Sequence, residues 1–388
     1  MKILFYQWNA FMQKGIENAF KRMTIEYDIF FYQFADGESW EKDEIFVDKF
    51  AKSLNKCGYD AVLSVNYVPL ISNICEEKGV PYISWVYDSP IHIRNLETMH
   101  NRCNRIYFFD RGQAEEYQRM GYENVYHMPL AVDGSVYEKM IQTVTTGDCN
   151  KYQSDISLVG QLYQSDFAYL CGPLDEYDCG FLEGVINAQL KIYGGYFLDK
   201  VITDKVLERL NDSYRRASGN TFTLRKRELE YTLACEITGR ERYMALALLS
   251  KRYGTSLYSK DQDSRLSGVN FRGYVDYYSQ MPKVFSLSNI NLNISLKTIR
   301  TGIPLRILDV MGCGGFVLTN YQEELLEWFT PGEDIVIYES LEDLVEKTTY
   351  YMEHEEQRKS IAWNGYEKVK REFDFESRLR RMFEDIGE

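Results

Sequence analysis

Short apolar runs alternate with longer amphipathic segments along the first 133 residues, and this alternation limits the folds open to the chain. The apolar runs are continuous rather than alternating in polarity, as in strands that are covered on both faces. We expect strands at residues 3–6, 29–34, 61–65, 82–87, 106–109 and 125–128, with helices near 13–23, 41–56, 68–78 and 111–120. Strands that alternate with helices form parallel sheets through right-handed crossovers. The sequence therefore predicts a Rossmann-like domain over residues 1–134.

The same pattern returns after a polar stretch at 135–154, which we interpret as a linker. We expect strands at 155–160, 256–259, 270–275, 290–294, 316–319 and 335–338, and helices at 278–287, 304–312, 321–329, 341–353, 356–371 and 374–386. Residues 163–250 are mostly helical in pattern, which is more helix than one crossover needs. We therefore predict a second Rossmann-like domain over 155–372 with a helical insertion at about 175–250, followed by a last helix within 373–388.

Two Rossmann-like domains joined by a linker are expected to enclose a cleft between them. Ligands of such sheets bind outside the carboxyl ends of the strands. The turn that follows the first predicted strand reads Gln-Trp-Asn-Ala-Phe over residues 7–11. It lacks the Gly-x-Gly-x-x-Gly fingerprint of dinucleotide-binding folds, which weighs against a nicotinamide or flavin enzyme.

Composition narrows the classes of partner. The chain has 45 basic and 58 acidic residues, a formal net charge of −13, which disfavours nonspecific binding to nucleic acid or anionic lipid. Its eight cysteines form no Cys-x-x-Cys pair, and with only four histidines a zinc site is not expected. No run of 18 apolar residues predicts a membrane span, and the first residues do not resemble a signal peptide. We expect a cytoplasmic protein with reduced thiols and no metal.

One motif, at residues 301–320, points to a ligand. Gly302 and Pro304 precede a predicted helix that carries Arg306 and Asp309 on one face, and three glycines end it. A helix N-terminus offers N–H groups and partial positive charge to a phosphate. Arg306 suits a diphosphate and Asp309 suits ribose hydroxyls, so the motif suits a sugar nucleotide. The alternative is an ordinary helix start with a solvated ion pair.

The sequence around this motif resembles a known family. The matching segments read Gly-Ile-Pro-Leu-Arg at 302–306, Cys-Gly-Gly-Phe-Val-Leu-Thr at 313–319 and Phe-Thr-Pro-Gly-Glu-Asp at 329–334. From Gly302 onward the chain resembles the C-terminal domain of CgeB-like, spore-maturation-type glycosyltransferases, which are related to the retaining family 4. Weaker similarity, including Pro-Tyr-Ile-Ser-Trp at 81–85 and Met-Pro-Leu-Ala-Val-Asp at 128–133, extends the resemblance to most of the chain outside the insertion.

The resemblance implies the GT-B fold, with the two parallel sheets facing an interdomain cleft and the last helix crossing back to the first domain. It implies a nucleotide sugar, with a UDP-sugar favoured, on the C-terminal domain and a hydroxyl acceptor on the N-terminal domain. The acceptor is a glycan, a protein or a small molecule, in keeping with cell-surface or spore glycosylation. We expect metal-independent hexosyl transfer with retention and no cofactor besides the donor.

Two features depart from the family pattern. Related retaining enzymes carry two carboxylates eight residues apart; the second maps to Asp309, but the first maps to Thr301. Those enzymes also place an arginine and a lysine after the first strand of the C-terminal domain, where this chain has Gln161. We propose as replacement cations Lys297, Arg300 and Arg306.

Further residues near predicted strand ends complete the candidate donor site. We expect Gly160 and Gln161 to line the cleft, Tyr274 to stack on the base and Asn293 to hydrogen-bond the donor. Thr301 and Gly302 begin the phosphate-facing helix. The alternatives are a plain turn at Gly160, a core position for Tyr274 and a turn-capping amide at Asn293.

For catalysis, Asp88 and His92 follow a predicted strand of the first domain, and either could orient or deprotonate an acceptor hydroxyl. The alternative for Asp88, which precedes Ser-Pro, is a turn-forming residue. The triplet Asp-Gln-Asp at 261–263 matches the metal motif of single-domain glycosyltransferases, but its polar flanks favour a solvated loop.

Two rival functions stay open. One is a nucleotide-sugar epimerase on the same fold. The other is a degenerate GT-B protein that binds a sugar or partner within a surface or spore assembly, which Thr301 and Gln161 favour. The glycines of the motif with Arg306 and Asp309 favour a working glycosyltransferase.

Overall fold

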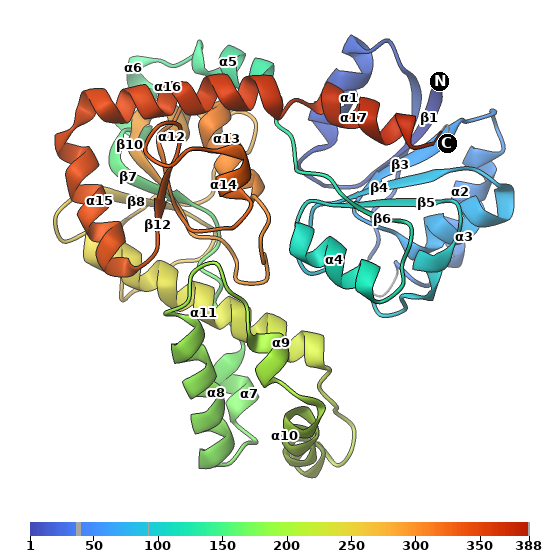
Figure 1. Ribbon diagram of the computed structural model, residues 1–388, viewed down its shortest axis with the longest axis horizontal. Coiled ribbons are helices and arrows are strands. Elements are labelled where there is room, and N and C mark those ends of the chain that lie inside the picture. The colour runs from blue at the N-terminus through green and yellow to red at the C-terminus, as the bar shows by residue number, and fades with distance from the viewer. Residues whose placement is uncertain (36–39, 92, 387–388) are drawn as a thin grey trace. The chain divides into compact units, whose positions relative to one another are not determined.

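The computed structural model describes residues 1–35, 40–91 and 93–386 (Figure 1). Its contacts divide the chain into two units. Unit 1 comprises Met1–Ser135, Thr301–Leu308 and the residues from Glu367 onward, and unit 2 comprises Val136–Arg300 and Asp309–Tyr366. Each unit carries one six-stranded sheet in which all paired strands are parallel, so the predicted α/β architecture with two Rossmann-like sheets is confirmed.

The sheet of unit 1 has the order β2-β1-β3-β4-β5-β6. Its strands are β1 (Lys2–Gln7), β2 (Glu26–Phe31), β3 (Ala61–Val65), β4 (Tyr82–Val86), β5 (Asn104–Phe108) and β6 (Val125–His127), so all six predicted strands are present. The helices between them are α1 (Gln13–Arg22), α2 (Glu44–Leu54), α3 (Pro69–Lys78), the 3₁₀ turn η1 (Glu97–His100) and α4 (Arg111–Arg119).

One predicted strand of unit 1 is covered less than expected. The central strands β3 and β4 are buried along their whole length, as continuous apolar runs predict. By contrast, Ile29 and Phe31 of β2 are 47% and 59% exposed. The reason is topological, because β2 is the edge strand of the sheet and only β1 pairs with it.

The end of the chain packs on unit 1. Helix α17 (Phe375–Glu384) follows α16 (Glu355–Glu372), and its Phe375 lies against α1 at Gly15, where a Cβ would be 2.3 Å from the phenyl ring. Phe375 also meets the ring of Trp85 edge-on, with centroids 5.9 Å apart. Beyond α17, the Tyr107 hydroxyl donates to Asp385 Oδ2 at 2.7 Å. These contacts make the C-terminal segment part of the core of unit 1.

The sheet of unit 2 has the order β12-β11-β10-β7-β8-β9. Its strands are β7 (Ser154–Val159), β8 (Thr255–Tyr258), β9 (Asn270–Phe271), β10 (Ser288–Asn293), β11 (Val317–Asn320) and β12 (Val336–Tyr338). Strand β9 is shorter than predicted, because the chain turns at Gly273 with a φ of +74°. Helices α12 (Met281–Leu287), α13 (Leu305–Gly312), α14 (Leu325–Trp328) and α15 (Leu341–Glu353) follow the predicted positions.

The segment predicted as a linker is largely helical. It forms α5 (Gly134–Ile141) and α6 (Thr146–Tyr152), which the low apolar periodicity did not indicate. Helix α6 begins with a capping box, in which Thr145 and Asp148 satisfy each other's backbone N–H groups. Capping and an ion pair from Asp148 to Lys283 of α12, 3.0 Å long, take the place of a broad apolar face.

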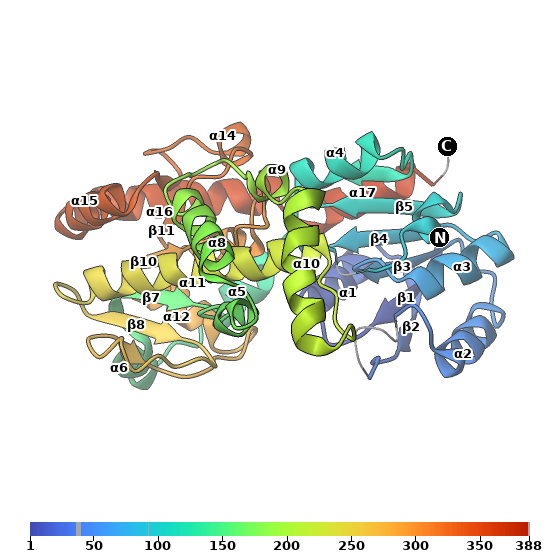
Figure 2. The same cartoon turned by 90° about the horizontal axis from the view of Figure 1, so that it is seen from below.

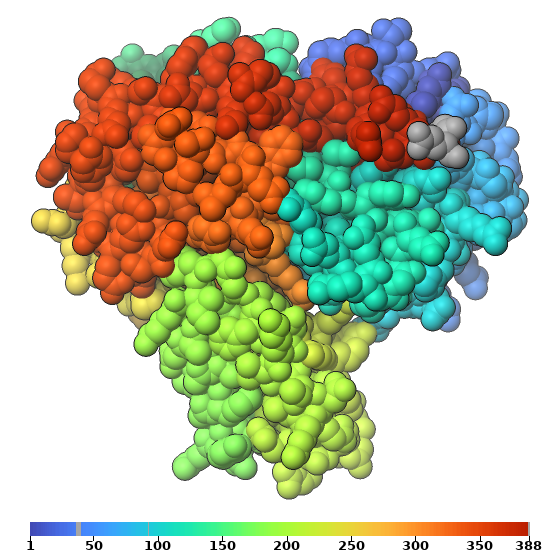
Figure 3. Space-filling model, viewed as in Figure 1, coloured from blue at the N-terminus to red at the C-terminus, as the bar shows by residue number. Residues whose placement is uncertain are grey.

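A helical insertion separates β7 from β8. It contains α7 (Phe167–Cys171), α8 (Glu176–Gln189), α9 (Leu198–Val201), α10 (Asp204–Ser218) and α11 (Lys226–Leu249). Its core is separate from that of the sheet and includes Leu182, Ile186, Leu229 and Leu233. Figure 1 shows α8 and α10 standing away from the sheet of unit 2, on the side from which Figure 2 views the molecule, and Figure 3 shows the insertion as a green lobe. Helix α11 packs on the sheet through Ala245, Leu246 and Leu249.

Candidate functional site

The carboxyl ends of β7 and β10 carry a buried cation. Arg242 of α11 is 8% exposed; its Nε donates to the carbonyl of Ile294 at 3.2 Å, and the guanidinium also hydrogen-bonds the carbonyl of Gln161. Gly160 ends β7 with a φ of +152°, and a Cβ there would lie 3.1 Å from Arg242 Nη1. Glycine is therefore needed for this approach. The guanidinium lies at the turn where the family resemblance led us to expect cations.

Helix α11 also holds the loop that follows β10. The backbone N–H of Lys297 donates to Thr238 Oγ1 at 3.1 Å, and Lys297 Nζ lies 2.9 Å from Glu241 Oε2. The other oxygen of Glu241 accepts the Tyr338 hydroxyl at 3.3 Å. Burial and then the nearby Glu241 carboxylate raise the pKa of Tyr193 and of Tyr338, so both phenols stay protonated at neutral pH. Helix α11 of the insertion thus holds the main chain where it leaves β7 and where it leaves β10.

Asp309, predicted to bind ribose, is buried within unit 2. Its side chain is 1% exposed, and its Oδ1 accepts the hydroxyls of Tyr137 at 2.6 Å and Tyr277 at 2.7 Å. Burial, followed by the Asp309 charge, raises the pKa of Tyr137 well above its usual value. Both hydroxyls bind the same carboxylate oxygen, and the ribose role of Asp309 stays a prediction.

Three other residues that were predicted to bind the nucleotide sugar lie in unit 2. Tyr274 follows the turn at Gly273 and is 59% exposed, with Lys260 Nζ 5.2 Å from its ring centroid. Arg300 lies 3.9 Å from Asp199 of α9 and stacks at 5.0 Å on Tyr196. Asn293 is buried, and its amide donates to Thr319 Oγ1 at 2.9 Å and Ser295 Oγ at 3.2 Å. The exposure of Tyr274 excludes the alternative of a core position, and its stacking on a base stays a prediction.

Unit 1 places Asp88 at the carboxyl edge of its own sheet. The buried Asn66 has a φ of +66°, donates from Nδ2 to Asp88 Oδ2 at 2.7 Å, and accepts the Tyr87 N–H at 2.8 Å. The amide therefore holds the carboxylate in one orientation. His92 lies outside the described residues, so its predicted role is untested.

The start of the glycine-proline motif packs on α4 of unit 1. Asp110 precedes α4, and its Oδ1 accepts the Thr301 hydroxyl at 3.0 Å and the Thr301 N–H at 3.2 Å. A Cβ at Gly302 would lie 2.7 Å from the Asp110 Cα, so only glycine allows this contact. Arg306 belongs to the same segment and is half-buried. The sequence assigned residues 301–308 to the second domain, whereas their contacts group them with unit 1.

The acidic triplet at 261–263 is engaged by neighbouring groups. Asp261 Oδ2 accepts the N–H of Leu162 at 2.9 Å, and Asp263 Oδ2 lies 2.6 Å from Arg265 Nη2. Within the described ranges, no three His, Cys, Asp or Glu side chains gather in a way that could hold a metal ion. Across the same ranges, no helix has the length and apolar character needed to cross a membrane.

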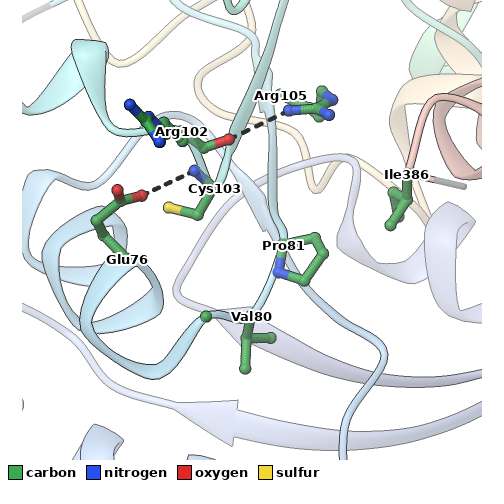
Figure 4. A pocket seen from close by; sticks show the side chains of 8 residues that line it. Glu76, Val80, Pro81, Arg102, Cys103, Arg105 and Ile386 are labelled. Atoms are coloured by element: carbon green, nitrogen blue, oxygen red, sulfur yellow. Dashed lines mark hydrogen bonds between the residues drawn. The ribbon is translucent and has the colours of Figure 1, made fainter. Parts of the chain in front are cut away.

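A pocket lies at the edge of the sheet of unit 1 where β4 and β5 begin, opposite the carboxyl edge that carries Asp88 (Figure 4). It has a volume of about 260 Å³, and Glu76 accepts the N–H of Cys103 there at 2.8 Å. Burial raises the pKa of the Cys103 thiol to about 12, so this cysteine is a protonated, unreactive group at neutral pH. Among the described residues, none of those predicted to bind the sugar donor or the sugar acceptor lines this pocket.

Part of the sequence is similar to a family of glycosyl transferase-like proteins, and stretches of the chain are similar to two individual proteins. Residues 221–384 match the model of a family described as glycosyl transferase-like. Spore protein CgeB of Bacillus subtilis is 19% identical over 299 residues, which cover 77% of this chain and 73% of CgeB. An uncharacterized protein of Aquifex aeolicus is 30% identical over 107 residues, 27% of each chain.

Solved structures share the fold over the whole chain. Anabaena HepE, crystallised in complex with UDP and glucose, has a TM-score of 0.56 at 12% identity and covers 100% of this chain and 99% of its own. Sucrose-phosphate synthase from Thermosynechococcus elongatus has a TM-score of 0.58 at 12% identity and covers 99% of this chain and 97% of its own. At these identities the likeness establishes the two-sheet fold, which is that of GT-B glycosyltransferases.

Proposed function

We propose that this chain, a CgeB-like glycosyltransferase with the GT-B fold, transfers a sugar from a UDP-sugar to a hydroxyl acceptor. The transfer needs no metal ion and retains the configuration of the anomeric carbon. Nucleotide-sugar transfer agrees with the glycosyl transferase-like family match and with the fold. The choice of UDP is supported by the fold neighbour crystallised with UDP and glucose.

The observation that carries the proposal is the position of Arg242. When the bond between the anomeric carbon and the diphosphate breaks, its electron pair leaves with UDP, and the diphosphate gains negative charge. Fixed cations in a site with little water stabilise that charge, as a metal ion does in other enzymes. Arg242 is buried at the carboxyl ends of β7 and β10, beside a glycine turn that brings no side chain into the space. Lys297, predicted as a second cation, is paired with Glu241 of the same helix, so Arg242 supplies the positive charge in this proposal.

Other residues take supporting roles in this proposal. The exposed ring of Tyr274 stacks on uracil, and Arg300 and Arg306 add positive charge for the diphosphate. Asp88, oriented by Asn66, accepts the proton that the acceptor hydroxyl loses as its oxygen bonds to the anomeric carbon. The spore protein among the relatives supports a surface glycan or protein as the acceptor.

Donor turnover tests the proposal. The purified chain is incubated with UDP-glucose, UDP-galactose, UDP-N-acetylglucosamine and GDP-mannose, with and without EDTA, and released nucleotide is measured. We expect UDP release from at least one UDP-sugar, no loss of rate with EDTA, and a product whose anomeric proton coupling matches that of the donor. Abolition by EDTA would contradict metal independence, and an inverted anomer would contradict retention.

One observation favours a second candidate, a GT-B protein that binds nucleotide sugars without turning them over. The carboxylate of Asp309 already accepts two tyrosine hydroxyls. UDP binding with neither nucleotide release nor epimerised donor would favour this candidate over the enzyme. An epimerised donor would instead identify an epimerase.

A further inference from the structure

We infer that a pocket beneath the helical insertion binds a neutral sugar unit of the acceptor, in addition to the acceptor contacts expected on the N-terminal domain, and this inference rests on the proposed function. The pocket lies in unit 2 between α8, α11 and two loops, one after β7 and one after β8, and has a volume of about 490 Å³. Ligand pockets typically measure about 300–1,000 Å³, and the lower part of that range suits a mono- or disaccharide.

The pocket adjoins the candidate diphosphate site. The loop at 162–165, which lines it, continues directly from the turn at Gly160. Tyr163 contributes to the lining and also lies against Arg242, with the guanidinium 4.7 Å from its ring centroid. Helix α11 touches this loop so closely that a Cβ at Gly239 would lie 2.8 Å from the Tyr163 carbonyl oxygen. One tyrosine ring therefore forms a wall shared by the pocket and the site of Arg242.

The charges that line the pocket compensate each other. Arg240 Nε lies 2.7 Å from Glu236 Oε1, and Arg265 Nη2 lies 2.6 Å from Asp263 Oδ2. The Arg240 guanidinium also donates to Glu183 of α8, which lies outside the lining, with Nη2 2.9 Å from Glu183 Oε2. These two pairs comprise all four charged side chains in the lining, so their net charge is zero. A UDP-sugar carries a charged diphosphate and would need an excess of positive charge. The pocket therefore suits an uncharged ligand, which in a glycosyl transfer is the acceptor rather than the donor.

The polar groups suit hydroxyls in particular. A sugar hydroxyl both donates and accepts hydrogen bonds, and each ion pair presents acceptor oxygens beside donor nitrogens. The amides of Gln164 and Asn187 add further groups of both kinds at the rim, and Tyr163 and Tyr243 supply apolar ring surface for the C–H groups of a sugar. A lining that combines rings with planar polar groups is selective for saccharides over apolar ligands.

Saccharide binding tests the inference. Saturation-transfer NMR and calorimetric titration with maltose, cellobiose, lactose and chitobiose are carried out on the full chain, with and without UDP. The variant is Asn187→Trp, which fills the pocket from an exposed position of α8. The control is Ala188→Trp, an exposed neighbour on α8 that does not line the pocket. A second variant, Gln164→Ala at an exposed loop position, removes an amide without adding bulk.

We expect at least one disaccharide to bind the native chain, with affinity reduced at least tenfold by Asn187→Trp, reduced less by Gln164→Ala and unchanged by Ala188→Trp. UDP affinity should stay within about twofold in all three variants. If the native chain binds UDP but no disaccharide, or if Asn187→Trp and Gln164→Ala both leave saccharide binding intact, the inference is overturned and the proposed function stands. Failure of the native chain to bind UDP would instead overturn the proposed function.

Discussion

At the residue scale, the candidate site depends on side chains that belong to different parts of the sequence. Gly160 and Lys297 follow predicted strands, so their place at the carboxyl edge of one sheet could be predicted from the strand pattern. Arg242 could not be predicted in this way. It lies inside a long helical stretch, and only the packing of α11 on the sheet shows which arginine reaches the edge. Asp309 was recognised as a special position, but its tyrosine partners are distant in sequence.

Arg242 gives the first prediction. Arg242→Gln should weaken UDP binding by roughly 10- to 100-fold, because a hydrogen bond to a charged group contributes about 1.5–3 kcal/mol. Uridine has no phosphate, so its affinity should be unchanged, and calorimetric titration compares the two ligands. Arg252→Gln, at an exposed arginine just beyond α11, is the matched control. An equal loss of uridine and UDP binding would mean that Arg242 supports the fold rather than the diphosphate.

The second prediction concerns the buried carboxylate of Asp309. Tyr277→Phe removes one of its two hydroxyl donors and should lower the free energy of unfolding by about 1–3 kcal/mol. Urea denaturation followed by circular dichroism measures the change. Tyr278→Phe, at the adjacent residue, is the comparison variant. A neutral Tyr277→Phe would show that water or Tyr137 replaces the lost donor at no cost.

At the element scale, the strands and most helices outside the insertion could be predicted, because continuous apolar runs and amphipathic periods are strong local signals. The insertion could be predicted only as a mostly helical stretch. The exceptions have physical causes. Helices α5 and α6 lack a broad apolar face, and α6 depends on its capping box and on the pair between Asp148 and Lys283. Strand β9 ends early at a glycine turn. Contacts between elements, such as α11 with the edge of the sheet, are not encoded in local periodicity.

Because Asp148 caps α6, we expect the stability of the folded chain to depend on pH. Hydrogen bonds from Thr145 N–H and then Lys283 lower the pKa of Asp148 from 3.8 to about 2. A lowered folded-state pKa contributes stability that is present above about pH 4 and is lost as the pH falls toward 2. Urea midpoints measured between pH 5 and 2 should therefore fall less steeply for Asp148→Asn than for the native chain. Parallel curves would show that this carboxyl has the same pKa in the folded and unfolded states.

At the scale of the whole molecule, the chain builds each unit from separated segments. Unit 1 begins at Met1 but takes its last helix from beyond unit 2, and α17 packs into its core through Phe375. The plan of two parallel sheets could be predicted from the alternation of elements, but the strand order of each sheet comes from the structure. The family resemblance implies the return of the last helix to the first domain. The grouping of residues 301–308 with unit 1 could not be predicted, because it depends on contacts between distant residues such as Thr301 with Asp110.

The prediction at the scale of the whole molecule concerns Phe375. Phe375→Ala should destabilise unit 1 by about 3–5 kcal/mol, because the ring is 3% exposed and its removal leaves a cavity beside Gly15 and Trp85. Hydrogen exchange should show faster opening of α1 than of the sheet of unit 2. Phe222→Ala, at a ring that is 46% exposed in the insertion, is the control and should have a small effect. Uniform loss of protection in both units would argue that the two unfold as one.

The central claim is that a nucleotide diphosphate binds at the carboxyl ends of β7 and β10, and a crystal soaked with UDP tests it most directly. We expect diphosphate density beside the turn at Gly160, within hydrogen-bonding distance of Arg242 or Lys297. Well-ordered UDP whose diphosphate lies at any other place on the chain would contradict it.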